Sequence, residues 1–206
     1  MNIYFIADCG YFSNYNNEET NTKLQNISNT INTNFNVQND LLLLGGDNFY
    51  PDGLNYINKE EYIKNYNKYF SRFNKKTYGI LGNHDYRDDI YIQMNNNKIF
   101  NMPDLYYKIS KPFDKLNSKN IDIFMIDTQI LDPEFCTSYN DIASSILEEK
   151  LEVMDISFPL IISLRKKMLR WLDNELMITN KKGNIPIICG HYPILTCGTY
   201  SYYNDY

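Results

Sequence analysis

The chain has 206 residues, enough for one domain with a sizeable hydrophobic core, and we expect residues 1–206 to form a single domain. Apolar residues make up 43% and charged residues 22%, close to the globular average, which excludes a fibrous repeat or a wholly disordered chain. The net charge of −5 argues against a nucleic-acid-binding footprint, because phosphate backbones attract basic surfaces.

No apolar run approaches the roughly 20 residues that span a bilayer, and the N-terminus lacks the basic and apolar regions of a signal peptide. We therefore expect a cytoplasmic or otherwise intracellular protein without a membrane segment. The four cysteines are far apart and lack Cys-x-x-Cys spacing, which favours reduced thiols over a zinc site. They are Cys9, Cys136, Cys189 and Cys197.

Four short apolar segments are predicted as strands, and each is followed by glycine or by a side chain that can bind a metal. Residues 2–7, which we expect to be buried on both faces, lead into Asp8-Cys9-Gly10. The other three segments lead into Gly45-Gly46-Asp47, Gly82-Asn83-His84-Asp85 and Gly190-His191. A fifth strand, residues 121–126, ends at Asp127, which we interpret as the cap of a turn.

Helical stripes lie between these strands and predict an α/β fold with parallel pairing. The stripes are Leu24, Ile27 and Ile31; Tyr62, Tyr66 and Phe70; and, within 160–178, Leu164, Met168, Trp171, Leu172 and Leu176. Residues 86–120 are polar and are predicted to form a long excursion over the site, and 132–158 to form a second insertion. In such folds ligands gather at the carboxyl ends of the strands.

The strand ends suggest a metal site. Asp8, Asp47, Asn83 and His191 are expected to point into one crevice, where oxygen ligands with an imidazole suit iron, manganese or zinc. Each motif alone has a simpler explanation, since Gly, Asp and Asn also form ordinary turns. The repetition at four strand ends favours the metal interpretation.

The sequence resembles the calcineurin-like metallophosphoesterases and, among them, the purple (tartrate-resistant type) acid phosphatases. The matching segments are Ala7-Asp8-Cys9-Gly10, Gly46-Asp47-Asn48-Phe49-Tyr50, Leu81-Gly82-Asn83-His84-Asp85-Tyr86, Phe124-Met125-Ile126-Asp127-Thr128 and Gly190-His191-Tyr192-Pro193-Ile194. The resemblance implies an α/β/β/α sandwich, C-terminally incomplete and equivalent to the N-terminal two-thirds of the family's fold.

The resemblance also implies a dinuclear metal centre, with Fe³⁺ paired with Fe²⁺, Zn²⁺ or Mn²⁺. Asp8, Asp47 and Tyr50 would bind the first metal, while Asp47, Asn83 and His191 would bind the second. His84 would be the catalytic residue that protonates the leaving oxygen or stabilises its charge.

The chain departs from the family pattern in two places. No Gly-His-x-His segment, which supplies one further histidine to each metal in the family, follows His191. Cys9 replaces the tryptophan of the family's usual Asp-Trp-Gly, although the aspartate is kept.

Two functions remain open on this evidence. The first is a metal-dependent phosphoester hydrolase of acid-phosphatase type, which acts on phosphomonoesters. The alternative is a non-catalytic or truncated remnant of the fold with impaired metal binding. An aspartate-based phosphatase is disfavoured, because Gly10 stands where a second carboxylate is needed. The sequence gives no indication of an oligomeric state.

Overall fold

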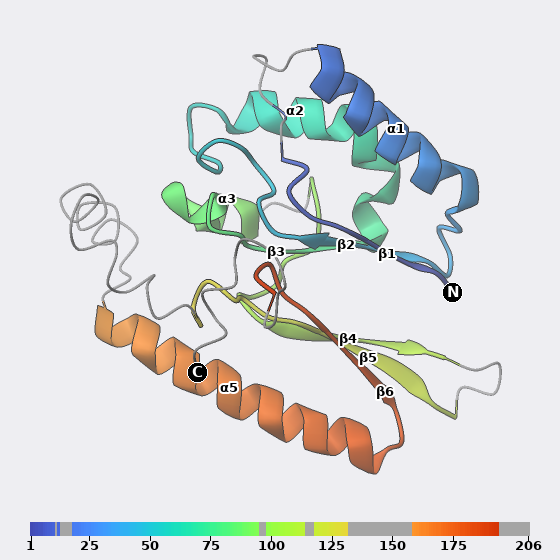
Figure 1. Ribbon diagram of the computed structural model, residues 1–206, viewed down its shortest axis with the longest axis vertical. Coiled ribbons are helices and arrows are strands. Elements are labelled where there is room, and N and C mark those ends of the chain that lie inside the picture. The colour runs from blue at the N-terminus through green and yellow to red at the C-terminus, as the bar shows by residue number, and fades with distance from the viewer. Residues whose placement is uncertain (11, 13–17, 95–97, 114–117, 132–157, 194–206) are drawn as a thin grey trace.

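The computed structural model describes residues 1–10, 12, 18–94, 98–113, 118–131 and 158–193. The predicted insertion at 132–158 therefore lies almost entirely outside the described residues, as do Cys136 and Cys197. Two three-stranded sheets face each other, and helices cover their outer faces (Figure 1). This layering of helix, sheet, sheet and helix confirms the predicted α/β/β/α sandwich.

The first sheet consists of β1 (Ile3–Ile6), β2 (Leu41–Gly45) and β3 (Thr77–Ile80), all parallel and in that order. The central strand β2 is buried along its whole length. Strand β1 lies at the edge, and Phe5 in it is 49% exposed. The prediction that this strand is buried on both faces is wrong, because an edge strand has a neighbour on one side only.

The second sheet consists of β4 (Tyr107–Pro112), β5 (Asn120–Met125) and β6 (Ile185–Cys189). Strands β5 and β6 are parallel, as predicted, but β4 pairs antiparallel with β5. The prediction of a long excursion over the site at 86–120 is therefore wrong for the part of this segment that joins the second sheet. The segment contains strand β4, preceded by the short α3 (Ile90–Met94).

The predicted helices form, and their apolar stripes face the sheets. They are α1 (Glu18–Asn34), α2 (Lys59–Phe70), which continues into the short helix η1 (Ser71–Lys76), and α5 (Phe158–Lys181). Helices α1 and α2 lie over the first sheet and α5 over the second (Figure 1). On α5, Met168 is fully buried and Trp171 packs against Phe124 of β5.

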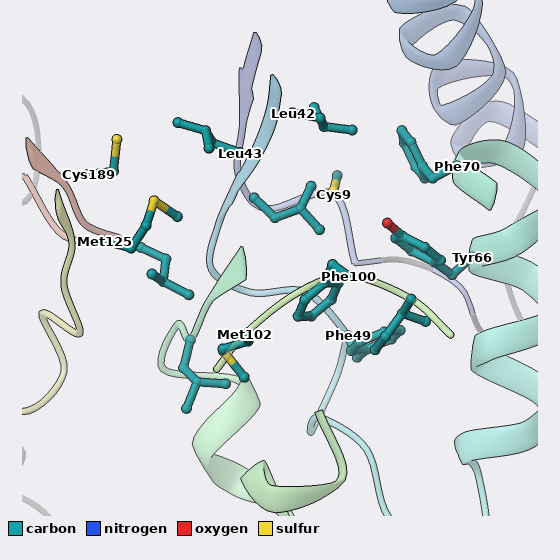
Figure 2. Close-up of a cluster of buried hydrophobic side chains, with 14 of the residues drawn as sticks. Cys9, Leu42, Leu43, Phe49, Tyr66, Phe70, Phe100, Met102, Met125 and Cys189 are labelled. Carbon is teal, nitrogen blue, oxygen red and sulfur yellow. The ribbon is translucent and has the colours of Figure 1, made fainter. Parts of the chain in front are cut away.

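The core extends on both sides of β2, because successive side chains of a strand point to opposite faces. Leu42 points toward Phe70 of α2, whereas Leu43 points between the sheets toward Met125 and Cys189 (Figure 2). Leu42 and Leu43 are almost fully buried, and each such leucine contributes about 1.5–3 kcal/mol of transfer free energy. This rigid sheet sets the position of the loops that follow its strands.

Two of the cysteines belong to this core. Cys9 and Cys189 are free and buried, which confirms the expectation of reduced thiols for these two residues. Burial raises the pKa of the Cys9 thiol to about 12 and that of the Cys189 thiol to about 11, so both are protonated at neutral pH.

Candidate active site

The predicted site residues lie at the carboxyl ends of four strands. Asp8 follows β1, Asp47 follows β2 and Asn83 follows β3, and the parallel pairing brings these three strand ends to one edge of the first sheet. His191 follows β6 of the second sheet and reaches across, with its Nδ1 2.8 Å from the carbonyl oxygen of Gly45. The structure thus brings all four residues together, as the sequence predicted.

The backbone is unusual at two of these positions. Asp8 and Asp47 have φ angles of 57° and 52°, a left-handed conformation that is uncommon for residues other than glycine. Such a conformation costs of order 1 kcal/mol and persists only where the surrounding structure fixes it. Here the amide of Asp8 donates to the carbonyl of Gly46 at 3.1 Å. The turns bring both carboxylates close to each other and to His191.

Two glycines make room for this close approach. Gly46 has a φ of 93°, and a β-carbon there would lie 2.8 Å from the His191 ring and from the amide nitrogen of Gly82. A β-carbon on Gly82 would lie 2.2 Å from Oδ1 of Asp47. The glycines of both motifs are therefore required by packing within the site, in addition to their role in turns.

The side chains converge on Asp47. One ligand atom each from Asp8, Asp47 and His191 all lie within 4.8 Å of one another. His191 Nε2 is 3.5 Å from Oδ1 of Asp47 and 3.2 Å from Oδ1 of Asn83. Because the carbonyl of Gly45 can only accept, Nδ1 of His191 donates to it, and Nε2 is the ring nitrogen that faces this cluster. In the neutral ring, this is the tautomer that a metal ligand needs.

Tyr50 completes the cluster on the other side of Asp47. Its hydroxyl lies 2.5 Å from Oδ2 of Asp47 and 2.9 Å from Oδ1 of Asp8. One hydroxyl proton cannot satisfy both carboxylates, so a cation placed among the three oxygens would be favourable. Burial and these two carboxylates hold the pKa of Tyr50 far above its usual value, and a phenolate therefore requires a cation in place of the proton. The oxygen-rich donor set fits a hard metal ion.

His84 borders the cluster without belonging to it. Its amide donates to Oδ1 of Asp47 at 2.9 Å, and its ring lies over the Tyr50 ring with centroids 4.4 Å apart. Its Nδ1 donates to the carbonyl of Pro51 at 2.6 Å, which leaves Nε2 facing the site, 4.0 Å from Oδ2 of Asp47. A residue in this position can exchange a proton at Nε2 with a group held by the cluster.

Comparison with known proteins identifies the family. The family model for calcineurin-like phosphoesterases matches residues 1–206. The chain belongs to this family. The strand-end loops described above all lie within the matched residues.

Curated relatives within the family are acid phosphatases. The human tartrate-resistant acid phosphatase type 5 is 29% identical over 161 residues, which cover 75% of this chain and 45% of the human protein. Purple acid phosphatase 7 and purple acid phosphatase 3 of Arabidopsis thaliana are 24% and 23% identical, over 78% and 96% of this chain. The chain spans about half the length of these relatives (45% and 49% of the two plant proteins).

A solved structure supports the fold of this chain. The structure described as "GAP50 the anchor in the inner membrane complex of Plasmodium" superimposes with a TM-score of 0.67 and 16% identity. The match covers 97% of this chain and 57% of that one. In the part of this chain that the structure describes, no helix is both long enough and apolar enough to cross a membrane.

The motifs of this calcineurin-like chain also contain a supporting residue that sequence reasoning missed. Asp85 is fully buried and accepts hydrogen bonds from the amides of Asn48, Phe49 and Gly82 and from the side chain of Gln93. Burial raises its pKa to about 6, although the hydrogen bonds act against the increase. Asp85 ties the loop after β2 to the loop after β3. In the sequence, only its position in the Gly-Asn-His-Asp motif pointed to this supporting role.

A second supporting group joins the loops that follow β5 and β6. Oγ1 of Thr128 accepts from the amides of His191 and Tyr192 at 3.1 and 2.8 Å and so fixes the turn that presents His191. Next to it, Oδ1 of Asp127 accepts from the amides of Gln129 and Ile130, which confirms the predicted turn cap. The sequence did not reveal the contacts that these two residues make with other loops.

Proposed function

We propose that the chain forms the principal part of a metal-dependent phosphomonoesterase of acid-phosphatase type. The observation that supports this most is the cluster around Asp47: Tyr50 and His191 lie against its two oxygens, Asp8 contacts Tyr50, and Asn83 contacts His191. The cluster combines anionic oxygen donors with an imidazole in the ligand tautomer. The family and its acid phosphatase relatives point to the same chemistry.

The cluster divides into two ligand sets that share Asp47. Its Oδ2 faces Tyr50, and with Asp8 this set would bind one metal ion. Its Oδ1 faces His191, and with Asn83 this set would bind a second. A phenolate is a hard anionic ligand, which suits Fe³⁺ in the first set and a divalent ion, Fe²⁺, Zn²⁺ or Mn²⁺, in the second.

The residues of the chain then have distinct roles in phosphomonoester hydrolysis. The bound metal ions would supply the positive charge for the phosphate and an acidified water as the nucleophile. His84 would donate a proton from Nε2 to the oxygen of the departing alcohol, since Pro51 already holds its Nδ1. Asp85 would keep the loops that hold Asp47 and His84 in register.

Metal content and hydrolysis test this proposal directly. The 206-residue chain is expected to bind iron and zinc or manganese, to gain thermal stability in their presence and to hydrolyse p-nitrophenyl phosphate. Asp47→Asn should abolish all three effects. Asp173→Asn makes the same change of charge at an exposed position on α5 and should leave them intact.

The same measurements distinguish the proposed hydrolase from the alternative, a non-catalytic remnant of the fold. If wild type and Asp47→Asn unfold at the same temperature with and without metal, the chain is a non-catalytic member of the fold. Tyr50→Phe gives an independent readout, because a phenolate bound to Fe³⁺ produces a visible charge-transfer band. That band should form in the iron-loaded wild type and be absent from the variant.

A further inference from the structure

Arg87 stands beside the residue that faces the substrate. It ends η2 (Asp85–Arg87), the short helical turn that follows His84. Its Nη2 lies 3.4 Å from Nε2 of His84, and its Nη1 lies 3.4 Å from both the carbonyl of Pro51 and Oδ1 of Asp52. These distances are at the long end for hydrogen bonds, and the Arg87 and Asp52 side chains are 42% and 57% exposed. The guanidinium thus lies at the partly exposed rim of the site, and its contacts with His84, Pro51 and Asp52 are long.

The position of His84 fixes what Arg87 can contact. Nε2 of His84 is close to both groups, 4.0 Å from Oδ2 of Asp47 and 3.4 Å from Nη2 of Arg87. A phosphate held at the Asp47 cluster with its leaving oxygen at Nε2 would therefore direct the alcohol portion of the substrate toward Arg87. The guanidinium would meet the leaving group, one or two bonds beyond the ester oxygen.

The geometry points to Arg87 as a specificity residue for a second anionic group on the substrate. The preferred substrates would be phosphomonoesters whose alcohol carries a carboxylate or a second phosphate close to the ester oxygen. The planar guanidinium fork suits both anions, which it can bind through two hydrogen bonds. One of its partners, Asp52, is an exposed carboxylate, and exposed ion pairs contribute little, so a substrate anion can compete with this carboxylate.

Matched substrates test this inference, which rests on the proposed function. We define the selectivity as the ratio of kcat/KM for phosphoglycolate to kcat/KM for ethyl phosphate, which lacks the second anion. A second ratio replaces phosphoglycolate by ethylene glycol bisphosphate, in which a phosphate takes the place of the carboxylate. Arg87→Gln should lower the selectivity by about 10- to 100-fold, since a hydrogen bond to a charged group is lost. Arg87→Lys should keep part of it, because lysine retains the charge without the fork. Arg72→Gln, at an exposed position on η1, should leave the ratio unchanged.

Binding gives a second measurement that does not require turnover. Calorimetry on the metal-loaded chain should show tighter binding of phosphonoacetate than of methylphosphonate, and Arg87→Gln should remove most of the difference. Asp52→Asn removes the competing carboxylate and should therefore increase the difference in affinity between phosphonoacetate and methylphosphonate. This variant tests the role of Arg87 even if Arg87→Gln does not fold. A preference unchanged in Arg87→Gln, or lowered in Asp52→Asn, would overturn the assignment. Absence of metal binding and hydrolysis in the wild type would instead defeat the proposed function.

Discussion

Replacing Asp127 by asparagine should change how the stability of the protein depends on pH. Asp127 is fully buried, and its Oδ2 lies 2.5 Å from the Tyr86 hydroxyl. Burial raises its pKa from 3.8 to about 7, and the hydrogen bonds from Tyr86, Gln129 and Ile130 only partly oppose this. Asparagine has the same shape and keeps the acceptor for the two amides, while its Nδ2 can donate to the Tyr86 oxygen. The variant therefore removes the ionisation and reverses the direction of the hydrogen bond with Tyr86.

The size of the effect follows from linkage between proton binding and folding. Because the pKa is higher in the folded state, the folded protein binds the proton more tightly, and the associated stability is complete below about pH 4. It is lost as the pH rises through about 7. A shift of about three units corresponds to roughly 4 kcal/mol, since each unit is worth about 1.4 kcal/mol. Relative to wild type, Asp127→Asn should gain up to this amount between about pH 4 and pH 8.

Denaturant unfolding followed by fluorescence measures this difference. Trp171 is the only tryptophan and packs against Phe124 and Tyr106, so its emission reports on the second sheet and α5. Asp85, whose pKa is also raised, is present in both proteins, and its contribution largely cancels in the comparison. A difference in the free energy of unfolding that stays constant over this range, or that favours wild type at high pH, would refute the reasoning.

Three further predictions concern the site and the core. Gly46→Ala should lower the free energy of unfolding by at least about 1 kcal/mol and abolish metal binding, because its β-carbon meets His191. Gly183 has a similarly positive φ of 65°, but a β-carbon there would only be in ordinary contact with the Lys119 side chain at 3.8 Å, so Gly183→Ala should keep metal binding in the same calorimetric titration. Thr128→Val should weaken metal affinity by about 10- to 100-fold, because the amides of the His191 turn lose their acceptor, whereas Thr128→Ser should retain it. Leu42→Ala should cost about 2–5 kcal/mol in denaturant unfolding, and Ile57→Ala, 94% exposed, less than about 0.5 kcal/mol.

Local patterns in the sequence were sufficient to predict the helices and the residues at the strand ends. The stripe on α5 predicts the burial of Met168 because helix periodicity depends on neighbouring residues alone. The clustering of Asp8, Asp47 and Asn83 is equally predictable, since parallel strands must bring their carboxyl ends together. The sequence likewise indicated that His191 joins them, through its place after a fourth strand-end glycine.

Features that depend on distant neighbours were not predictable. In β4 only alternate residues such as Tyr107 and Ile109 are buried, and Lys108 pairs with Glu175 of α5, so the strand looks like a polar loop until its partners are known. The exposure of Phe5 follows from the edge position of β1, which strand order alone decides. Tyr86 and Asp127 are 41 residues apart, and nothing in either segment indicates the other.

The residues around Asp47 lie far apart along the chain, and this separation affects the kinetics of folding. The contacts from His191 to Asn83 and to Gly45 join residues 108 and 146 positions apart. Contacts between such distant residues form slowly, because a long loop must close before they contribute any stability. Metal ions would then bind only after β6 has docked. They would lengthen the lifetime of the native state while leaving the rate of refolding almost unchanged.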